Sequence, residues 1–331
     1  MASIKDVAKH AGVAISTVSK VLNNYPNIGE ETKKRVNAAI EELGYVPNAV
    51  AAALSSKKSG RIALVMHLNM YTQAMDEISM QYLVGALRRA KELGLDVVIV
   101  FFSMLEEKSL EEVSNYFRSQ NISGIVVFGA VKTQKTLLKL VEKQLFKMVL
   151  VDAPLINEST SCVWIDHAKA QYDVAKATME LDTITYKSLL YIAGKKSSYV
   201  TKERIRGIKQ FAQDHRMKLI IKEGDFSEKK ARELTFEYGE DVDMIACASD
   251  LMAIGAMWAL TEMDIFRPVC GFDGIALMGY AGKQMETVKQ DFYHIAEEAV
   301  TELNVLMNGG SGREIMPDYQ LIRMKYEDII K

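Results

Sequence analysis

Apolar residues recur every three or four positions over the first 45 residues, which is the spacing of one face of a helix. The first such stripe begins after Ser3, and Asp6 stands three residues later, so that the two side chains can cap free backbone N–H groups. Gly12 ends this predicted helix, and a second helix begins near Ile15. The pattern therefore predicts two short helices joined by a tight turn.

A third stripe predicts a helix from about Glu30 to Leu43, ending at Gly44. A helix, a glycine-containing turn and a second short helix are typical of helix-turn-helix motifs that bind DNA. Three helices of this size also occur in bundles that bind other proteins, so the spacing alone leaves both interpretations open.

Residues 45–48 form a second break, and the alanine-rich segment 49–54 that follows favours a helix by its composition. So short a helix is not stable alone. Residues 55–60, which are rich in serine, lysine and glycine, indicate a flexible basic linker. A helix at 49–54 therefore needs a partner in order to form.

From Arg61 onward, short β-rich apolar runs alternate with amphipathic segments. A first set of strands is predicted at Ile62–Met66, Val97–Phe102, Gly124–Phe128 and Met148–Val151. A second set is predicted at Cys162–Ile165, Ser188–Ala193, Leu219–Lys222, Met244–Cys247 and Val269–Gly271. Two consecutive series of this kind predict an α/β body with two parallel, doubly wound sheets. Because ligands bind outside the carboxyl ends of such strands, two facing lobes would form a cleft.

The composition is that of a globular protein with two or three domains: 331 residues, 49% hydrophobic and 25% charged. The net charge of −2 conceals an asymmetry, because residues 1–60 hold eight Lys/Arg against five Asp/Glu and the remainder holds 33 against 38. A small basic segment joined to an acidic body suits a protein whose one end meets the phosphates of DNA.

No apolar run approaches the ~18 residues that span a bilayer, and the charged N-terminus lacks the apolar core of a secretory signal. We therefore expect a cytoplasmic protein that makes no membrane contact. The three cysteines, Cys162, Cys247 and Cys270, are widely spaced and form no Cys-x-x-Cys pair. Neither a disulfide framework nor a metal site nor a cofactor is expected.

Motifs spread along the whole chain resemble the lactose/galactose repressor family of bacterial transcriptional regulators. In the N-terminal region they are Ile4–Val13, Thr17–Asn23 and Leu43–Asn48. In the body they are Gly194, Arg204–Gly207, Glu223–Phe226, Asp250–Gly255, Gly271–Asp273 and Thr287–Phe292. The N-terminal motifs are highly specific for the family, whereas each body motif is weak when taken alone.

The resemblance implies a homodimer that places two helix-turn-helix heads on the half-sites of a palindromic operator in double-stranded DNA. It implies a DNA-binding head at 1–46, a hinge helix and linker at 47–60, and an effector-binding and dimerisation domain at 61–331. The body would resemble periplasmic sugar-binding proteins. Its N-lobe would span about 61–160 and 291–318, and its C-lobe about 161–290 and 319–331.

By the resemblance, the second helix directs Ile15, Ser16 and Lys20 at base edges, where a lysine can donate to guanine and an isoleucine can contact a thymine methyl group. Phosphate contacts are expected from Ser3, Thr17, Ser19, Asn23 and Asn27. Minor-groove contacts are expected from Asn48, Ala51, Leu54 and Ser55, with the leucine as an apolar wedge. The alternatives are a solvated surface lysine at position 20 and an ordinary linker helix.

Three residues depart from the family pattern. Ala14 stands where a serine usually caps the recognition helix, and an uncapped start costs about 1 kcal/mol of helix stability. Ala52 and Ala53 replace polar or basic hinge residues, so the base preference of relatives does not transfer to this chain. Gly29, at the start of the third helix, is an acceptable cap.

Four residues match the effector cleft of the family: Asp152, Arg204, Phe226 and Asp273. Carboxylates and an arginine can bond the neighbouring hydroxyls of a sugar, while an aromatic ring packs on its C–H face. The set therefore predicts a sugar or sugar phosphate as the effector. Further contacts are expected from His67, Asn69, Tyr71 and Ser249, the last standing where sugar-responsive relatives often have asparagine.

Each of these assignments has a plainer alternative. Asp273 could cap a helix, and Phe226 could belong to the core. Asp250 is predicted to cap the helix that follows it, so it is left out of the effector set. None of the five histidines stands at metal-ligand or triad-like spacing from a cysteine or carboxylate, so all are expected at the surface or in the core.

Other classes of protein would share parts of this sequence pattern. A transport binding protein would have the two-lobed body but not the helix-turn-helix head. A hydrolase or transferase using Asp152 and Asp273 would need a nucleophile–base pair, which the sequence does not offer, so no catalytic residue is predicted. A regulator of the same family controlled by a partner protein stays open. The sequence predicts a dimeric, ligand-responsive repressor of carbohydrate-utilisation genes and not an enzyme.

Overall fold

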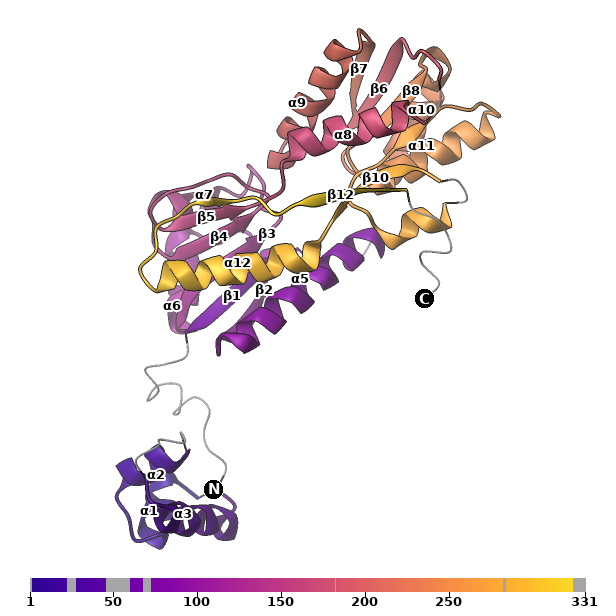
Figure 1. Ribbon diagram of the computed structural model, residues 1–331. Helices are drawn as coiled ribbons and strands as arrows, with labels where there is room; N and C mark the ends of the chain where they lie inside the picture. The colour runs from indigo at the N-terminus through magenta and orange to yellow at the C-terminus, as the bar shows by residue number, and fades with distance from the viewer. Residues whose placement is uncertain are drawn as a thin grey trace. The chain divides into compact units, whose positions relative to one another are not determined.

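The computed structural model describes residues 2–22, 28–45, 60–67, 73–181, 183–281 and 284–323. The chain divides into two units, Met1–Ser59 and Gly60–Lys331, each described by itself below (Figure 1). The predicted loop at 23–27 and the predicted hinge helix and linker at 47–59 lie outside the described residues.

The described residues of the first unit form three helices: α1 (Ile4–His10), α2 (Ile15–Leu22) and α3 (Glu30–Leu43). The Ser3 Oγ accepts a hydrogen bond from the Asp6 N–H, and the Asp6 carboxylate accepts one from the Ser3 N–H, so the predicted capping box is present. Gly12 turns the chain with a φ of 62° between α1 and α2, and Gly44 ends α3 with a φ of 57°. The core contains one wholly buried valine from each helix: Val7, Val18 and Val36. The predicted helix-turn-helix architecture is confirmed.

The first sheet of the body has the strand order β11-β5-β4-β3-β1-β2, and all its paired strands are parallel. Its strands are β1 (Arg61–Met66), β2 (Asp96–Phe101), β3 (Ile122–Phe128), β4 (Lys147–Val151), β5 (Thr160–Val163) and β11 (Glu314–Ile315). Its helices are α5 (Gln73–Glu92), α6 (Leu110–Ser119), α7 (Lys135–Glu142) and α12 (Phe292–Met307), with a 3₁₀ turn η1 (Phe102–Met104). We call this part the N-lobe.

Helices cover both faces of the N-lobe sheet because its strands are apolar on both sides. Leu64 of β1 packs in one cluster with Tyr82 of α5, whereas the next residue, Val65, packs in another with Phe117 of α6. On the first face α5 and α12 run side by side (Figure 1). They approach so closely that a Cβ atom at Gly85 would lie 2.2 Å from the backbone oxygen of Tyr293.

The second sheet has the order β12-β10-β9-β8-β6-β7, and all its pairs are parallel except β10 with β12. Its strands are β6 (Ser188–Ala193), β7 (Lys218–Glu223), β8 (Met244–Cys247), β9 (Val269–Cys270), β10 (Glu286–Gln290) and β12 (Tyr319–Arg323). Its helices are α8 (His167–Met179), α9 (Tyr199–Asp214), α10 (Glu228–Tyr238) and α11 (Asp250–Glu262), with 3₁₀ turns η2 (Gly239–Asp241) and η3 (Ala276–Tyr280). Helices α8 and α9 pack together, as do α10 and α11 (Figure 1). We call this part the C-lobe.

The predicted two-lobed α/β body is confirmed, with one strand placed in the wrong sheet. The strand predicted at Cys162–Ile165 was assigned to the second set, but β5 pairs with β4 in the N-lobe sheet. Only a loop joins these two parallel strands, whereas an α-helix separates the sequential strands β1 and β2, β3 and β4, β6 and β7, and β8 and β9. Because no helix separates β4 from β5, the segment between them looks like a boundary between lobes in the sequence.

The chain passes between the lobes three times: after β5, after β10 and after β11. At the last crossing, the wholly buried carboxylate of Glu302 on α12 accepts hydrogen bonds from the Ser161 Oγ, at 2.8 Å, and from the Arg313 guanidinium. This charge-assisted cluster ties the loop before β11 to the N-lobe. Among the described residues, no helix is long and apolar enough to cross a membrane.

Candidate functional site: a polar cavity between the lobes

A cavity of about 190 Å³ lies between the two lobes, beside the carboxyl ends of β4 and β9. Its polar lining consists of Asp152, Ser198, Arg204, Ser249, Asp273 and Gln290. Its larger apolar and aromatic lining groups are Ile78, Tyr82, Val200, Phe226, Leu251, Ile275 and Phe292. A few convergent polar groups on a mostly apolar wall are typical of sites for small molecules.

Each lobe contributes one carboxylate at the end of a strand. Asp152 follows β4 directly and has a φ of 63°, and Asp273, which follows β9 by a few residues, has a φ of 131°. Positive φ is uncommon for residues other than glycine, and such strained backbone clusters at functional sites. Here the turns bring both carboxyl groups to the wall of the cavity.

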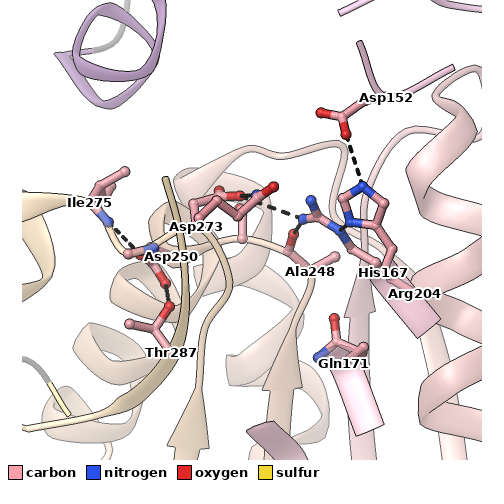
Figure 2. Close-up of polar contacts among 12 residues, drawn as sticks. Asp152, His167, Gln171, Arg204, Ala248, Asp250, Asp273, Ile275 and Thr287 are labelled. Carbon is pink, nitrogen blue, oxygen red and sulfur yellow. Dashed lines mark hydrogen bonds and ion pairs between the residues drawn. The ribbon is translucent and has the colours of Figure 1, made fainter. Parts of the chain in front are cut away.

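The single arginine of the cavity is held by several partners. Arg204 lies on α9 and is only 4% exposed. Its guanidinium donates to the backbone oxygen of Ala248 and lies 3.7 Å from the Asp273 carboxylate (Figure 2). It also stacks over the Phe272 ring, with its Cζ atom 3.6 Å from the ring centroid. These contacts fix the position of the only positive charge that lines the cavity among the described residues.

His167, at the start of α8, joins the carboxylate of the N-lobe to this arginine (Figure 2). Its Nε2 atom lies 2.9 Å from Asp152 Oδ1, and its Nδ1 atom lies 3.4 Å from Arg204 Nε. Because an arginine N–H can only donate, Nδ1 must accept, and the imidazole proton of the neutral ring is on Nε2. Burial lowers the pKa of His167, although the Asp152 carboxylate acts in the opposite sense, so the neutral form is favoured.

Asp273 is surrounded by groups that neutralise or bond it. The Gln290 side chain donates to Asp273 Oδ1 at 3.1 Å, and Arg204 stands on the other side. Burial raises the pKa of the Asp273 carboxyl above its ordinary value, against the opposing effect of the Arg204 charge. Asp273 therefore does not cap a helix, which was the plainer alternative for this residue.

The aromatic wall of the cavity depends on a glycine. The Phe226 ring lies directly over Gly194, where an added Cβ atom would come within 2.1 Å of the ring. The backbone of Phe226 also has a positive φ, 59°. A bulkier residue at 194 would therefore push the ring out of the place that it holds against the cavity.

Asp250 does not cap α11, contrary to the prediction. The cap is Ser249, whose Oγ accepts from the Met252 N–H at 3.3 Å. The wholly buried Asp250 carboxylate accepts instead from the backbone N–H groups of Gly274 and Ile275 and from the Thr287 hydroxyl (Figure 2). Asp250 thus binds the turn that contains Asp273, and it lies behind the wall of the cavity.

Hydrogen bonds join the two lobes at two places beside the cavity, between Glu77 and Ala276 and between Lys132 and Ser197–Ser198, and we call these contacts the seams. On one side, the Glu77 carboxylate of α5 accepts a hydrogen bond from the Ala276 N–H of η3, with both oxygens at 3.1 Å. On the other, the Lys132 N–H donates to the Ser197 backbone oxygen at 2.9 Å, and its ammonium reaches the Ser198 backbone oxygen at 3.4 Å. The lobes are therefore joined across the cavity by hydrogen bonds that a rotation of one lobe would break.

Five of the eight predicted effector residues line this cavity: Asp152, Arg204, Phe226, Ser249 and Asp273. His67 is not among its lining residues and stacks on Phe102 with ring centroids 4.2 Å apart. Asn69 and Tyr71 lie outside the described residues. The sequence missed His167, whose partners are 15 and 37 residues away along the chain. It also missed Tyr82, which belongs to none of the motifs, and Gln290, which lies in the Thr287–Phe292 motif but was not assigned to the effector site.

In the first unit, the residues predicted to face DNA lie mainly on the exposed side of α2. Ile15, Ser16 and Lys20 are exposed, Thr17 and Ser19 are partly buried, and Val18 and Val21 face the core. Ser3 is exposed, and its hydroxyl forms the cap of α1. Asn23, Asn27, Asn48, Ala51, Leu54 and Ser55 lie outside the described residues. Ile15, an apolar residue at the start of α2, is 45% exposed.

Comparison with known proteins identifies the class of this chain. A family model described as bacterial regulatory proteins of the lacI family matches residues 3–48, and one described as periplasmic binding proteins and the sugar-binding domain of the LacI family matches residues 67–290. The chain therefore belongs to the LacI family. It is a DNA-binding transcriptional regulator, from a family that is not enzymatic.

Individual relatives match over nearly the whole chain. The transcriptional regulator AscG of Escherichia coli is 27% identical over 94% of this chain and 93% of its own length. The ribose operon repressor of Halalkalibacterium halodurans is 28% identical over 89% of this chain and 87% of its own. A crystal structure of the lac repressor dimer, bound to operator and the anti-inducer ONPF, covers 98% of this chain and 99% of that one with a TM-score of 0.83 and 23% identity.

Proposed function

We propose that this protein is a cytoplasmic repressor of carbohydrate-utilisation genes, which binds a palindromic operator as a homodimer and is controlled by a neutral sugar. The observation that carries the proposal is the inter-lobe cavity, where Asp152, Asp273 and Arg204 converge opposite the Phe226 ring. Carboxylates accept from sugar hydroxyls, the guanidinium donates to them, and the ring packs on the apolar face of the sugar.

The charge of the cavity favours a neutral effector over a sugar phosphate. The one arginine that lines it among the described residues is already engaged by Ala248 and Asp273. A phosphate group would find little unpaired positive charge there and would stand near the Asp152 carboxylate, and like charges at close range disfavour binding. The volume of about 190 Å³ is also below the range of most drug-sized ligand sites, which favours a single sugar ring.

The surface of α5 supports the dimer. Met80, Val84 and Leu87 stand at helical spacing and are 58%, 49% and 39% exposed. Three large apolar side chains in one exposed stripe are expensive to leave in water and are typical of surfaces that pair with another chain. A two-fold dimer places two heads on two half-sites, as a palindromic operator requires.

DNA recognition is assigned to the exposed side of α2. Lys20 can donate to guanine in the major groove, and Ile15 offers an apolar contact to a thymine methyl group. Phosphate contacts would come from the other polar residues predicted in the first unit, and minor-groove contacts from the hinge residues. We keep the domain limits of 1–46, 47–60 and 61–331 as part of the proposal.

The hydrogen bonds that join the lobes across the cavity suggest how a ligand would control operator binding. A sugar that binds better when the lobes are closed shifts the population toward that arrangement, and the operator-binding state must then change with it. By linkage, operator and sugar change each other's affinity by the same factor. Whether the sugar releases the operator or tightens it is left to the measurement.

The test is fluorescence anisotropy of the full-length protein on the intergenic DNA upstream of its own gene, at two salt concentrations. Neutral sugars and the corresponding sugar phosphates are then added to the complex. We expect sequence-selective binding that one neutral sugar shifts. An Asp273→Asn variant should be about tenfold less responsive, because an NH2 donor replaces one of the two oxygens of the buried carboxyl group. Asp241→Asn, an exposed residue of η2, is the matched control. A response to sugar phosphates alone, or equal sugar affinity with and without operator, would contradict the proposal.

A further inference from the structure

The His167 ring occupies a place that packing alone does not explain. It is wholly buried beside the cavity, and both of its nitrogens are bonded, one to a carboxylate of the N-lobe and the other to the arginine of the C-lobe. Trp164 and Phe272 flank it, with ring centroids 5.8 Å and 5.7 Å away. An apolar side chain would fill this space at no cost of desolvation, so the polar ring serves its two partners.

The two bonds determine what these partners can offer a ligand. Asp152 Oδ1 accepts a hydrogen bond from the His167 Nε2–H, and the Tyr82 hydroxyl also bonds the Asp152 carboxylate, so part of its accepting capacity is already used. Arg204 donates through Nε to His167 and through a terminal nitrogen to Ala248. Both charged groups are thus held in one orientation with part of their bonding capacity already used.

We propose that His167 is the specificity-determining positioning residue of the inter-lobe cavity. As a neutral ring with its proton on Nε2, it uses part of the accepting capacity of Asp152 and withholds the Nε–H of Arg204 from an incoming anion. This inference rests on the proposed function and extends it, because it assigns the preference for a neutral sugar to a residue that need not touch the sugar.

A direct consequence concerns the balance of charges. With His167 neutral, the cavity holds the Asp152 carboxylate, the Asp273 carboxyl group with its raised pKa, and one arginine whose Nε edge is covered. Removing the imidazole uncovers that edge and leaves Asp152 without that partner. The cavity then becomes worse for a neutral polyol, whose acceptor is misplaced, and better for an anion, which can reach the freed N–H.

The first experiment examines the ring itself, in the ligand-free full-length protein. Long-range ¹H–¹⁵N NMR spectra distinguish the two neutral tautomers and the imidazolium, and the His167 signals are assigned by their loss in His167→Gln. We expect the Nε2–H tautomer, retained as the pH falls past the ordinary histidine pKa of about 6.5. An imidazolium at neutral pH, or a proton on Nδ1, overturns the proposal.

The second experiment measures selectivity by calorimetry, with D-glucose, D-galactose and D-ribose as neutral probes and inorganic phosphate as the anionic probe. His167→Leu should weaken the neutral probe that binds wild type by about tenfold, because two buried polar groups lose a partner, and should strengthen phosphate relative to it. His167→Gln can still donate to Asp152 and should recover most of the loss.

His215→Leu is the matched control, since this histidine of the C-lobe packs on Phe211 and does not line the cavity. It should change neither the affinity nor the ratio of neutral probe to phosphate. The proposal is overturned if His167→Leu binds both probes as wild type does, or if both weaken equally. If wild type binds no neutral probe, the proposed sugar control fails, and the tautomer measurement still upholds or overturns the bonding assigned to His167.

Discussion

The two lobes have sheets of the same size and similar winding, yet they contribute different chemistry to the cavity between them. The C-lobe supplies Arg204, Ser249, Asp273 and Gln290, and these groups are bonded within that lobe. The N-lobe supplies one carboxylate, Asp152, whose bond to His167 crosses to the C-lobe. The remaining N-lobe lining is mainly apolar or aromatic.

This difference indicates that the C-lobe half of the site is organised before the lobes close. A sugar can first meet the fixed polar groups of the C-lobe, and the N-lobe then adds an apolar cover and one acceptor. Groups already held in place lose little freedom on binding, which raises affinity. Under the proposed function, closure is the step at which the N-lobe would respond to the ligand.

The largest effect should come from removing the cation that organises the C-lobe half. Arg204→Leu leaves Asp273 buried beside no positive charge and leaves the Ala248 oxygen without its donor, which should lower the free energy of unfolding by about 3–5 kcal/mol and abolish the sugar response. Chemical denaturation and anisotropy check the two expectations. Arg206→Leu, on the same helix but exposed, should cost about 0–1 kcal/mol and leave the response intact. Similar losses in both variants would contradict this view of the C-lobe.

A smaller effect is expected from the single carboxylate of the N-lobe. Asp152→Asn keeps an oxygen that can accept from His167, so the fold should be retained while the affinity for the sugar falls by about tenfold or less. Calorimetry with the sugar that shifts the operator complex measures the change, and Asp96→Asn, exposed in the same lobe, is the control. If Asp152→Asn lost more affinity for the sugar than Asp273→Asn, the N-lobe would contribute more to binding than the C-lobe, contrary to the proposal.

The smallest effect is a pH dependence of the free energy of unfolding, which comes from Asp250 behind the cavity wall. Burial raises the pKa of Asp250 to about 6, despite hydrogen bonds from Thr287, Ile275 and Gly274 that act in the opposite sense. Because the folded state then holds a proton that the unfolded state has lost, the free energy of unfolding should fall as the pH rises from about 4 to about 6. Asp250→Asn should reduce this slope in denaturation curves of the body, and the part that remains comes from Asp273, whose pKa burial also raises. An unchanged slope would show that Asp250 ionises normally.

Local signals were enough to predict the head and most strands. The pair Ser3 and Asp6, and the glycines at 12 and 44, act on neighbours within a few residues, so the sequence contains what their geometry needs. The assignment of β5 failed because pairing between strands is a long-range choice. Strands β10 and β12 were missed as well: β12 lies half-exposed at the sheet edge and alternates only weakly.

The resemblance named single residues that line the cavity, whereas residues that act through contacts between distant segments were missed. Asp152, Arg204, Phe226, Ser249 and Asp273 gather around one cavity, as expected. Ser249 and Asp250 are both good helix caps, and sequence could not decide between neighbours one residue apart. His167 follows an aspartate at the start of a helix, which gave no hint of the carboxylate and arginine that the fold brings to it.

The crossings between the lobes also determine the order in which the parts can be completed during synthesis. The N-lobe strands β1 to β5 leave the ribosome first, but α12, which covers β3, β4 and β5, is made only after the whole stretch from α8 to β10. A nascent chain ending near residue 290 therefore has a C-lobe lacking only the edge strand β12, beside an N-lobe sheet with apolar residues uncovered. This stage of translation is where the chain is most exposed to aggregation and most in need of a chaperone.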